Sequence, residues 1–167
     1  NPGAMVKEAC LLADSLVNFA DYDWDGDGEV DQVFILYAGY NEAESNIRNS
    51  IWPHEWNLTS TIGSTITLDG TVIDTYACSS EFKGSSGASI AGIGSICHEF
   101  SHCLGFPDTY DVNYGGNFGM GGWDLMCSGN YNNDSFVPAG YTSYEKMLCG
   151  WLKPIELTDS CKIKGMK

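Results

Sequence analysis

The chain has 167 residues, of which 43% are hydrophobic and 13% are aromatic. This length and composition suffice for one folded domain with a buried core and argue against a disordered chain. The formal net charge of −14 disfavours nucleic acid and anionic membrane surfaces as partners, and no apolar run is long enough to cross a bilayer.

The segment from Ala4 to Phe19 is predicted to form an amphipathic helix. Its apolar residues recur at steps of three and four, a spacing that places them on one helical face. These residues are Ala9, Leu12, Leu16 and Phe19. We expect this face to pack on a sheet, and core packing is favoured over binding of a partner.

An acidic loop follows, with the sequence D-Y-D-W-D-G-D-G-E-V-D from Asp21 to Asp31. Aspartates at alternate positions direct oxygen atoms to one centre, and glycine permits the tight turn around a hard cation. Phe34 takes the place of the bidentate glutamate that ends a full EF-hand loop. We expect a Ca²⁺ loop that leads into a strand, and an acidic surface turn is the alternative. The predicted ligands are Asp23, Asp25, Asp27 and Asp31.

The apolar run from Gln32 to Tyr37 predicts a central strand that is buried on both faces. The polar segment from Asn41 to Asn49 is expected to be a solvated loop, in which Glu42 and Glu44 are weaker candidates for oxygen ligands. His54 lies between two tryptophans and follows a proline. A structural hydrogen-bonding role is therefore favoured for His54 over metal binding.

Two β-rich runs, Thr61 to Thr67 and Thr71 to Ala77, are separated by Leu68-Asp69-Gly70. Asp-Gly between such runs predicts a β-hairpin, because both residues tolerate the left-handed backbone of a tight turn. The stretch from Ser79 to Ser89 is rich in serine and glycine, and we expect it to be a mobile connection.

The most informative stretch runs from Cys97 to Asp111 and reads C-H-E-F-S-H-C-L-G-F-P-D-T-Y-D. Its H-E-x-x-H portion places His98 and His102 on one face of a helix, where both imidazoles can reach one metal ion. Glu99 lies beside that ion, which is where the general base for a zinc-bound water belongs.

Asp108 extends this pattern to H-E-x-x-H-x-x-G-x-x-D. Gly105 is suited to end the helix in a left-handed conformation, after which the chain can turn back and offer Asp108 as a third ligand. Two imidazoles, one carboxylate and one open position are typical of a catalytic zinc site and not of a closed structural one. The alternative is a polar helix face with two solvated histidines.

Seven cysteines, an odd number, leave at least one thiol free or paired elsewhere. No C-x-x-C pair is present, so a thiolate zinc cluster is not indicated. Cys97 flanks the metal-binding motif, but it shares an apolar stripe and is predicted to be a small core residue. The other members of the stripe are Ile90, Ile93, Phe100 and Leu104.

Beyond the metal-binding motif, the stretch 111–122 is a glycine-rich irregular loop. It is not a phosphate-binding loop, because no Gly-Lys-Ser/Thr follows. Thr142-Ser143-Tyr144-Glu145 is a capping box that opens a short helix, and Gly150 is expected to close that helix.

Five segments in this order resemble the metzincin clan of metallopeptidases, and more narrowly the secreted immune inhibitor A type. They read D-x-D-G-D-G-x-x-D, I-W-P-H, H-E-F-S-H-C-L-G-F-P-D, W-D-L-M-C-S-G and Y-E-K-M-L-C-G-W-L. Many metzincins carry a third histidine where this chain has Asp108. An aspartate in that place is known in the immune inhibitor A type, so Asp108 makes the chain resemble this family more than other metzincins.

The resemblance implies an α/β (α+β) fold, a metzincin-like zincin catalytic domain with a twisted mixed sheet, a backing helix and an active-site helix. It implies that Met126 lies in a turn beneath the metal and that Tyr131 is a candidate to stabilise an oxyanion. The Tyr76 to Phe82 region would be the edge strand that pairs with substrate. Residues 1–167 are expected to form a single catalytic domain from a longer secreted precursor.

We therefore expect a zinc-dependent endopeptidase that hydrolyses peptide bonds of extracellular proteins through a zinc-activated water, with Zn²⁺ and Ca²⁺ as cofactors. Its expected partners are protein or peptide substrates, without nucleic acid or membrane insertion, and we expect a secreted monomer. Two alternatives remain open. One is a thermolysin-like zinc peptidase with the distant Glu145 as third ligand, and the other is a calcium-stabilised binding module without catalytic activity.

Overall fold

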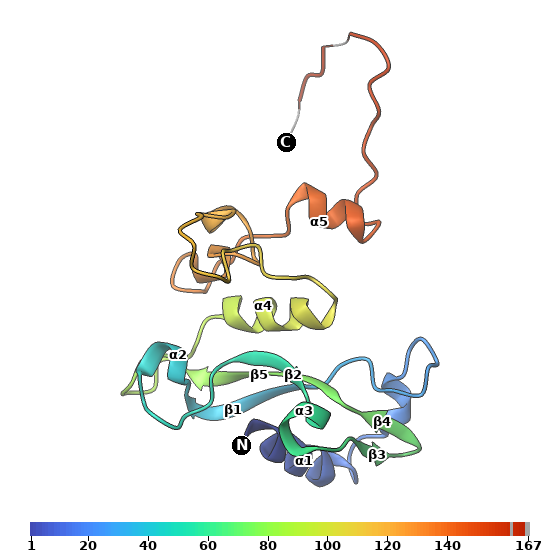
Figure 1. The fold of residues 1–167 in the computed structure, drawn as a ribbon, viewed down its shortest axis with the longest axis vertical. Coiled ribbons are helices and arrows are strands. Elements are labelled where there is room, and N and C mark those ends of the chain that lie inside the picture. Colours follow the sequence, from blue (N-terminus) through green and yellow to red (C-terminus); the bar gives the residue numbers. More distant parts are fainter. Residues whose placement is uncertain (161, 166–167) are drawn as a thin grey trace.

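A three-stranded sheet with the strand order β1-β5-β2 lies in the lower part of Figure 1, which shows the computed structural model. The structure describes residues 1–160 and 162–165. Strand β1 (Phe34–Tyr40) runs parallel to β5 (Thr75–Phe82), and β2 (His54–Asn57) runs antiparallel to β5. The fold is mixed α/β with a twisted mixed sheet and helices, as the sequence predicts.

The central strand of this sheet is β5 and not β1, so two predictions are wrong. Residues 76–80 of β5 are at most 1% exposed, whereas Leu36 of the edge strand β1 is 57% exposed. The antiparallel edge strand is β2, and the Tyr76 to Phe82 region is therefore not an edge strand. The serines of β5 made this strand look exposed in the sequence. The Ser80 hydroxyl can be buried because it accepts a hydrogen bond of 2.7 Å from the Asn41 side chain.

The predicted hairpin is confirmed as β3 (Ile66–Leu68) and β4 (Thr71–Ile73), which pair antiparallel. Asp69 and Gly70 connect the strands with φ angles of 52° and 83°. Positive φ at both central residues is the conformation that Asp-Gly favours in a two-residue turn. The second predicted run is longer than expected, because it continues past Ile73 into β5.

Helix α1 (Pro2–Ala13) backs the sheet, as predicted for the N-terminal segment, but it buries a different face. Val6 and Cys10 are buried, whereas Leu12 and Leu16 are 72% and 86% exposed. The helix also ends at Ala13, and Phe19 lies in a separate 3₁₀ helix, η1 (Phe19–Tyr22).

Gly3 explains this orientation of α1. A Cβ atom at Gly3 would lie 2.0 Å from the Thr61 hydroxyl oxygen of helix α3 (Leu58–Ile62). Only glycine allows the two helices to approach this closely, so the Gly3 face of α1 is the one that turns inward.

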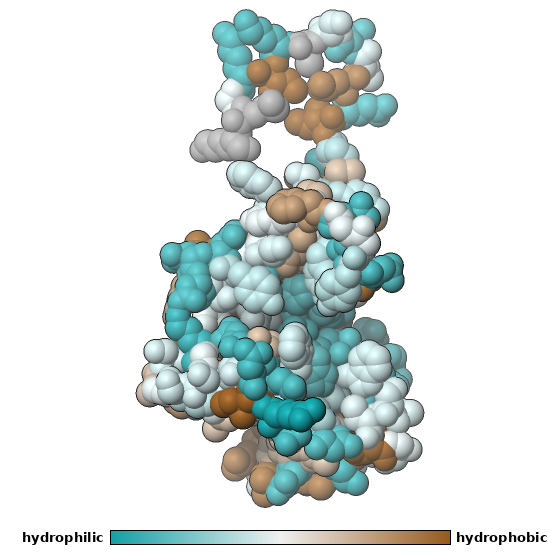
Figure 2. Space-filling view, turned by 60° about the vertical axis from the view of Figure 1, so that its left-hand side comes forward, coloured by the Kyte–Doolittle hydropathy of each residue, from teal (hydrophilic) through white to brown (hydrophobic). Residues whose placement is uncertain are grey.

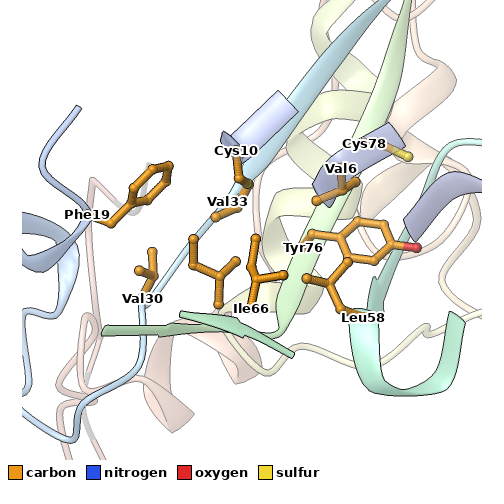
Figure 3. Packing of buried hydrophobic residues seen from close by; sticks show 10 residues of the cluster. Val6, Cys10, Phe19, Val30, Val33, Leu58, Ile66, Tyr76 and Cys78 are labelled. Carbon is orange, nitrogen blue, oxygen red and sulfur yellow. The ribbon is translucent and has the colours of Figure 1, made fainter. Parts of the chain in front are cut away.

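The main core lies between α1, the sheet and the β3–β4 hairpin (Figure 3). It joins buried side chains from α1, η1, α3 and the strands β3, β4 and β5, together with the segment that precedes β1. Its buried members are Val6, Cys10, Phe19, Val30, Val33, Leu58, Ile66, Ile73, Tyr76 and Cys78.

Helix α4 (Ile93–Cys103) lies on the opposite side of the sheet from α1 and packs on β5 and β2 (Figure 1). The chain beyond α4 forms an irregular upper part with two 3₁₀ helices, η2 (Gly121–Trp123) and η3 (Gly129–Tyr131). Helix α5 (Ser143–Leu148) follows, and residues 152–160 and 162–165 contain no helix or strand. Helix α4 thus separates the sheet from the irregular part.

A second, smaller core joins α4 to the upper part through Phe106, Leu125 and Met126, against which Cys97 packs. Cys97 is half-buried and packs against this core, so the prediction that it is a core residue is confirmed only in part. The rest of its apolar stripe is not in the core, because Ile93 is 54% exposed and the other members are 38–66% exposed. The helix buries its metal-site face toward the sheet and the upper part, which leaves this stripe outside.

Two short helices complete the fold. Helix α2 (Glu42–Ser45) occupies part of the segment predicted to be a solvated loop. Helix α5 begins with the predicted capping box of Thr142 and Glu145, and Gly150 follows its end with a φ of 70°. The six cysteines that the structure describes are free thiols, and Cys161 lies outside the described residues. Within the described ranges, no helix is both long and apolar enough to span a membrane.

Candidate metal centre and cleft

Helix α4 brings His98 and His102 together, one helical turn apart. Their Nε2 atoms lie 3.2 Å from each other, and the Asp108 Oδ1 atom lies 3.1 Å from His98 Nε2 and 3.4 Å from His102 Nε2. The structure therefore brings together the three residues that the sequence predicts as zinc ligands. No other described residue with a metal-ligating side chain joins this group.

Asp108 reaches the histidines because the chain reverses after α4. Gly105 has a φ of 88° and its amide donates a hydrogen bond of 2.8 Å to the His102 carbonyl. The predicted left-handed conformation of Gly105 is thus confirmed, and glycine is required because other residues are strained there. Phe106 then donates to the Ser101 carbonyl, which directs the next residues back across the helix end.

Backbone carbonyls fix the orientation of both imidazoles. His98 Nδ1 lies 2.9 Å from the Leu125 carbonyl oxygen, and His102 Nδ1 lies 2.8 Å from the Phe106 carbonyl oxygen. A carbonyl oxygen can only accept a hydrogen bond, so each neutral ring carries its proton on Nδ1. Each Nε2 therefore presents a lone pair to the other and to Asp108, as metal-binding histidines do.

The donor atoms fit a cation. Asp108 Oδ1 is buried and has no hydrogen-bond partner among the described residues. With both Nδ1 atoms protonated, it faces two nitrogen lone pairs, and three acceptors at this separation repel one another unless a positive charge lies between them. Two imidazole nitrogens and one carboxylate oxygen are a common donor set for zinc.

Glu99 lies beside this group without joining it. The Glu55 backbone in β2 lies near its carboxylate and lowers its pKa, but by less than burial raises it. Burial raises the pKa of Glu99 to about 7, against the opposing effect of His102. A carboxyl group whose pKa is near neutrality can both accept and release a proton under physiological conditions. The proximity of the β2 backbone to Glu99 was not predicted from the sequence.

Residues after α4 form a braced turn beneath the histidines. Met126 is fully buried, and its carbonyl accepts a hydrogen bond of 2.8 Å from the Thr109 amide. Asp124, also fully buried, accepts hydrogen bonds from the Thr109 hydroxyl and the Met126 amide. Met126 lies in the second core. The turn thereby ties the Leu125 carbonyl, which holds His98, to the segment that carries Asp108.

A cleft of about 470 Å³ opens beside His98 and Glu99. Aromatic residues at its wall include Trp52, Tyr110, Tyr114 and Tyr131, the last of which is 59% exposed. Burial and the neighbouring Asp108 raise the pKa of Tyr110 to about 12, so its hydroxyl is protonated at neutral pH. The sequence predicts Tyr131 at the site but does not predict Tyr110.

Glu145 does not reach the metal centre. Its carboxylate accepts hydrogen bonds from the Thr142 amide and hydroxyl at 2.6 and 2.7 Å, as the capping box requires. His54 is likewise held in place, because its ring contacts the Trp52 carbonyl at 2.6 Å and the Tyr76 hydroxyl at 3.1 Å. The favoured hydrogen-bonding role of His54 therefore agrees with the structure.

The acidic loop forms a second group of candidate ligands, Asp23, Asp25 and Asp27, whose carboxylate oxygens lie within 4.8 Å of one another. Asp31, the fourth predicted ligand, is not in this group. Its carboxylate instead accepts a hydrogen bond of 2.5 Å from the Trp24 amide. Loop amides also donate to Asp23 and Asp27, which holds the loop in its turn.

Comparisons with known proteins agree with this geometry. The chain is 29% identical to the pre-pro-metalloprotease PrtV of Vibrio cholerae serotype O1 over 174 residues, which are 87% of this chain and 18% of that protein. It is 26% identical to immune inhibitor A of Bacillus thuringiensis subsp. alesti over 195 residues, which are 99% of this chain and 28% of that protein. The chain thus spans less than a third of the length of these relatives.

The sequence model of one protein family matches most of the chain. Residues 13–151 match the catalytic domain of the immune inhibitor A peptidases, M6. This range contains the three candidate zinc ligands, Glu99, the acidic loop and the cleft. The chain therefore belongs to the immune inhibitor A (M6) family of metallopeptidases.

Proposed function

We propose that this chain is a zinc-dependent endopeptidase in which His98, His102 and Asp108 hold the metal. The observation that carries the proposal is the meeting of two Nε2 atoms and one unpartnered carboxylate oxygen within 3.1–3.4 Å. A bound zinc ion supplies Lewis-acid chemistry, which acidifies water and polarises the scissile carbonyl. The motif with Asp108 and the turn at Met126 support placement in the metzincin clan.

Glu99 is the proposed general base. Its position next to the ligands lets it take a proton from the attacking water and later deliver a proton to the leaving amine. Tyr131 stands at the wall of the cleft, where its hydroxyl is a candidate to stabilise the oxyanion.

The proposal has two rivals. A thermolysin-like site would use Glu145 as the third ligand, but that carboxylate is engaged by Thr142 in the capping box. A binding module without activity would not require a carboxyl group with a pKa near 7 beside the metal ligands, which Glu99 provides. Both observations favour the zinc peptidase.

The proposal also covers a calcium site, the location of the protein and its oligomeric state. We infer that Asp23, Asp25 and Asp27 bind Ca²⁺, because three carboxylates meet around a glycine-containing turn. Secretion, protein substrates and a place within a longer precursor are inferred from similarity to relatives several times longer, one of which is named a pre-pro-metalloprotease. A monomer remains the expectation.

Metal analysis combined with peptide cleavage tests the function. The purified protein should contain one zinc per chain and should cleave an internally quenched peptide. Glu99→Gln should keep the zinc and lower kcat by about a hundredfold or more, because only the general base is removed. Turnover that persists in a zinc-loaded Glu99→Gln protein would refute the role of Glu99, and a protein that binds no zinc would refute the metal assignment.

A further inference from the structure

Two hollows adjoin each other beside the metal centre. The cleft next to His98 is followed by a second hollow of about 590 Å³, and both are lined by Glu44 and Tyr131. The second hollow continues along the serine- and glycine-rich segment after β5. Figure 2 faces the side on which α2 lies, and hydrophilic residues cover most of the middle of this face. Glu44 and Tyr131 therefore stand midway along one extended groove.

Glu44 carries the one negative charge of this groove that no other described group accounts for. His98 and Glu99 belong to the proposed metal centre, and Lys83 pairs with Asp134. Among the residues that the structure describes, no lysine or arginine forms an ion pair with Glu44. Its carboxylate accepts only a long hydrogen bond of 3.3 Å from the Gly84 amide. The groove thus presents an exposed carboxylate without a cationic partner.

The backbone that carries Glu44 is fixed by a buried amide. Asn41 is 3% exposed, and its side chain accepts a hydrogen bond of 2.8 Å from the Glu44 amide while it donates one of 2.7 Å to Ser80 in β5. Asn41 thereby caps α2 and anchors it to the central strand. A group on an anchored helix loses less conformational freedom when a ligand binds, so a ligand can bind Glu44 at a lower entropic cost.

Asn130 is a second residue of the cleft whose polar side chain is suited to contact a ligand. The residue is 4% exposed and lines the cleft, and its side-chain Oδ1 atom has no hydrogen-bond partner among the described residues. A buried acceptor without a partner costs free energy that a ligand recovers when it donates a hydrogen bond. The backbone N–H of an extended peptide is such a donor.

We propose that Glu44 determines specificity by binding a lysine or arginine side chain of the peptide substrate, an inference that rests on the peptidase function proposed above. Trp52 and Tyr131, which are 58% and 59% exposed, offer apolar and aromatic surface to the long aliphatic stem of such a side chain. The carboxylate then pairs with its charged end. An acidic side chain at the same place would meet Glu44 as a like charge.

Matched peptides test this inference. Internally quenched peptides that differ at one position, which carries lysine, norleucine or glutamate, are compared while that position is moved along three residues on each side of the cleaved bond. At one position the lysine peptide should have a kcat/KM about fivefold above the norleucine peptide, which corresponds to about 1 kcal/mol. Glu44→Gln should bring this ratio close to one. Glu44→Lys should make the glutamate peptide a better substrate than the lysine peptide.

Glu42→Gln is the matched control, because Glu42 lies on the same helix but lines neither hollow. It should keep the lysine preference of the natural protein. Cleavage of the norleucine peptides without a lysine preference at any position, or a preference that survives Glu44→Gln, would overturn the inference and leave the peptidase function intact. Failure of the zinc-loaded protein to cleave any peptide would instead refute the proposed function.

Discussion

The tips of His98, His102 and Asp108 form a cluster of acceptors that the rest of the protein holds rigidly. Both imidazoles are oriented by backbone carbonyls, and Gly105 allows Asp108 to return to them. The positions of these side chains thus depend on contacts that exist without the metal. Such preorganisation means that each proposed ligand should contribute to zinc affinity without a large ordering cost.

Asp108→Asn should weaken zinc binding at least about a hundredfold, because loss of a direct ligand exceeds the 10–100-fold effect of losing a residue that only supports one. Glu145→Gln is the control that separates the two ligand sets, since Glu145 lies in the capping box. Competition with a chromophoric chelator measures both affinities. Zinc affinity that falls in Glu145→Gln and survives in Asp108→Asn would reverse the assignment in favour of the thermolysin-like site.

A buried thiol gives a prediction for alkaline pH. Burial raises the pKa of Cys78 from 9.0 to about 12. The folded state then retains a proton that the unfolded state releases above pH 9, so the free energy of unfolding falls as pH rises through this range. The fall from this one group is about 1 kcal/mol between pH 9 and pH 10.

Urea unfolding of Cys78→Ala at several pH values measures this effect. The variant should lose less stability between pH 9 and pH 10 than the natural protein, whatever its stability at neutral pH. Cys149→Ala is the control, because Cys149 is exposed and should leave the pH dependence unchanged. An equal slope in the Cys78 variant and the natural protein would contradict the assignment.

Structural features that depend on residues close together in the sequence were predicted well. The histidine spacing, the left-handed Gly105, the Asp-Gly hairpin and the capping box each depend on residues within a few positions of one another. The face that α1 buries depends instead on its contact with Thr61 at Gly3. The central place of β5 depends on two partner strands, and its serines conceal it in the sequence.

Parts of the site were not predicted, because they also depend on contacts between distant segments. The Glu55 backbone affects the pKa of Glu99 only because β2 packs against α4, and such a backbone effect cannot be predicted from the sequence. Asn130 lies in the cleft because a glycine at position 94 lets η3 approach α4, where a Cβ atom would lie 1.8 Å from the Asn130 carbonyl oxygen. Such contacts join segments that are far apart in the chain.

The acidic loop is an element whose stability should depend on calcium. Ca²⁺ that binds only the folded state adds about 2.7 kcal/mol at a hundred times its dissociation constant, which for a domain of this size raises Tm by about 5–10 °C. Asp25→Asn should abolish most of this rise. Asp31→Asn should keep more of it, because Asp31 is bound to the Trp24 amide and lies outside the carboxylate group.

Differential scanning fluorimetry over a calcium titration, with zinc held constant, gives the measurement. Asp14→Asn serves as the control, because this aspartate caps the end of α1 and belongs to neither metal group. A calcium-dependent rise in Tm that is equal in the natural protein and Asp25→Asn would show that these aspartates form an ordinary acidic turn. A larger loss in Asp31→Asn than in Asp25→Asn would restore Asp31 as a ligand.

The candidate metal centre lies where α4 meets the irregular upper part. The helix supplies His98, His102 and Glu99, and the segment after it supplies Asp108 and the carbonyls that orient the histidines. The main core lies on the other side of the sheet and contains none of these residues. Among the described residues, the upper part has only the small core of Phe106, Leu125 and Met126, so we expect the proposed zinc to contribute more to its stability than to that of the main core.

Removal of zinc should therefore loosen the upper part and leave the main core closed. Hydrogen exchange followed by mass spectrometry, with a chelator selective for zinc in the presence of calcium, should show faster exchange at the amides of 105–131 and unchanged exchange in β5. Removal of calcium should instead speed exchange in the loop from Asp23 to Asp31. Local opening of this kind reports the contacts that each metal holds. Equal acceleration in β5 and 105–131 on zinc removal would mean that the molecule opens as one unit and that the metal does not act mainly on the junction.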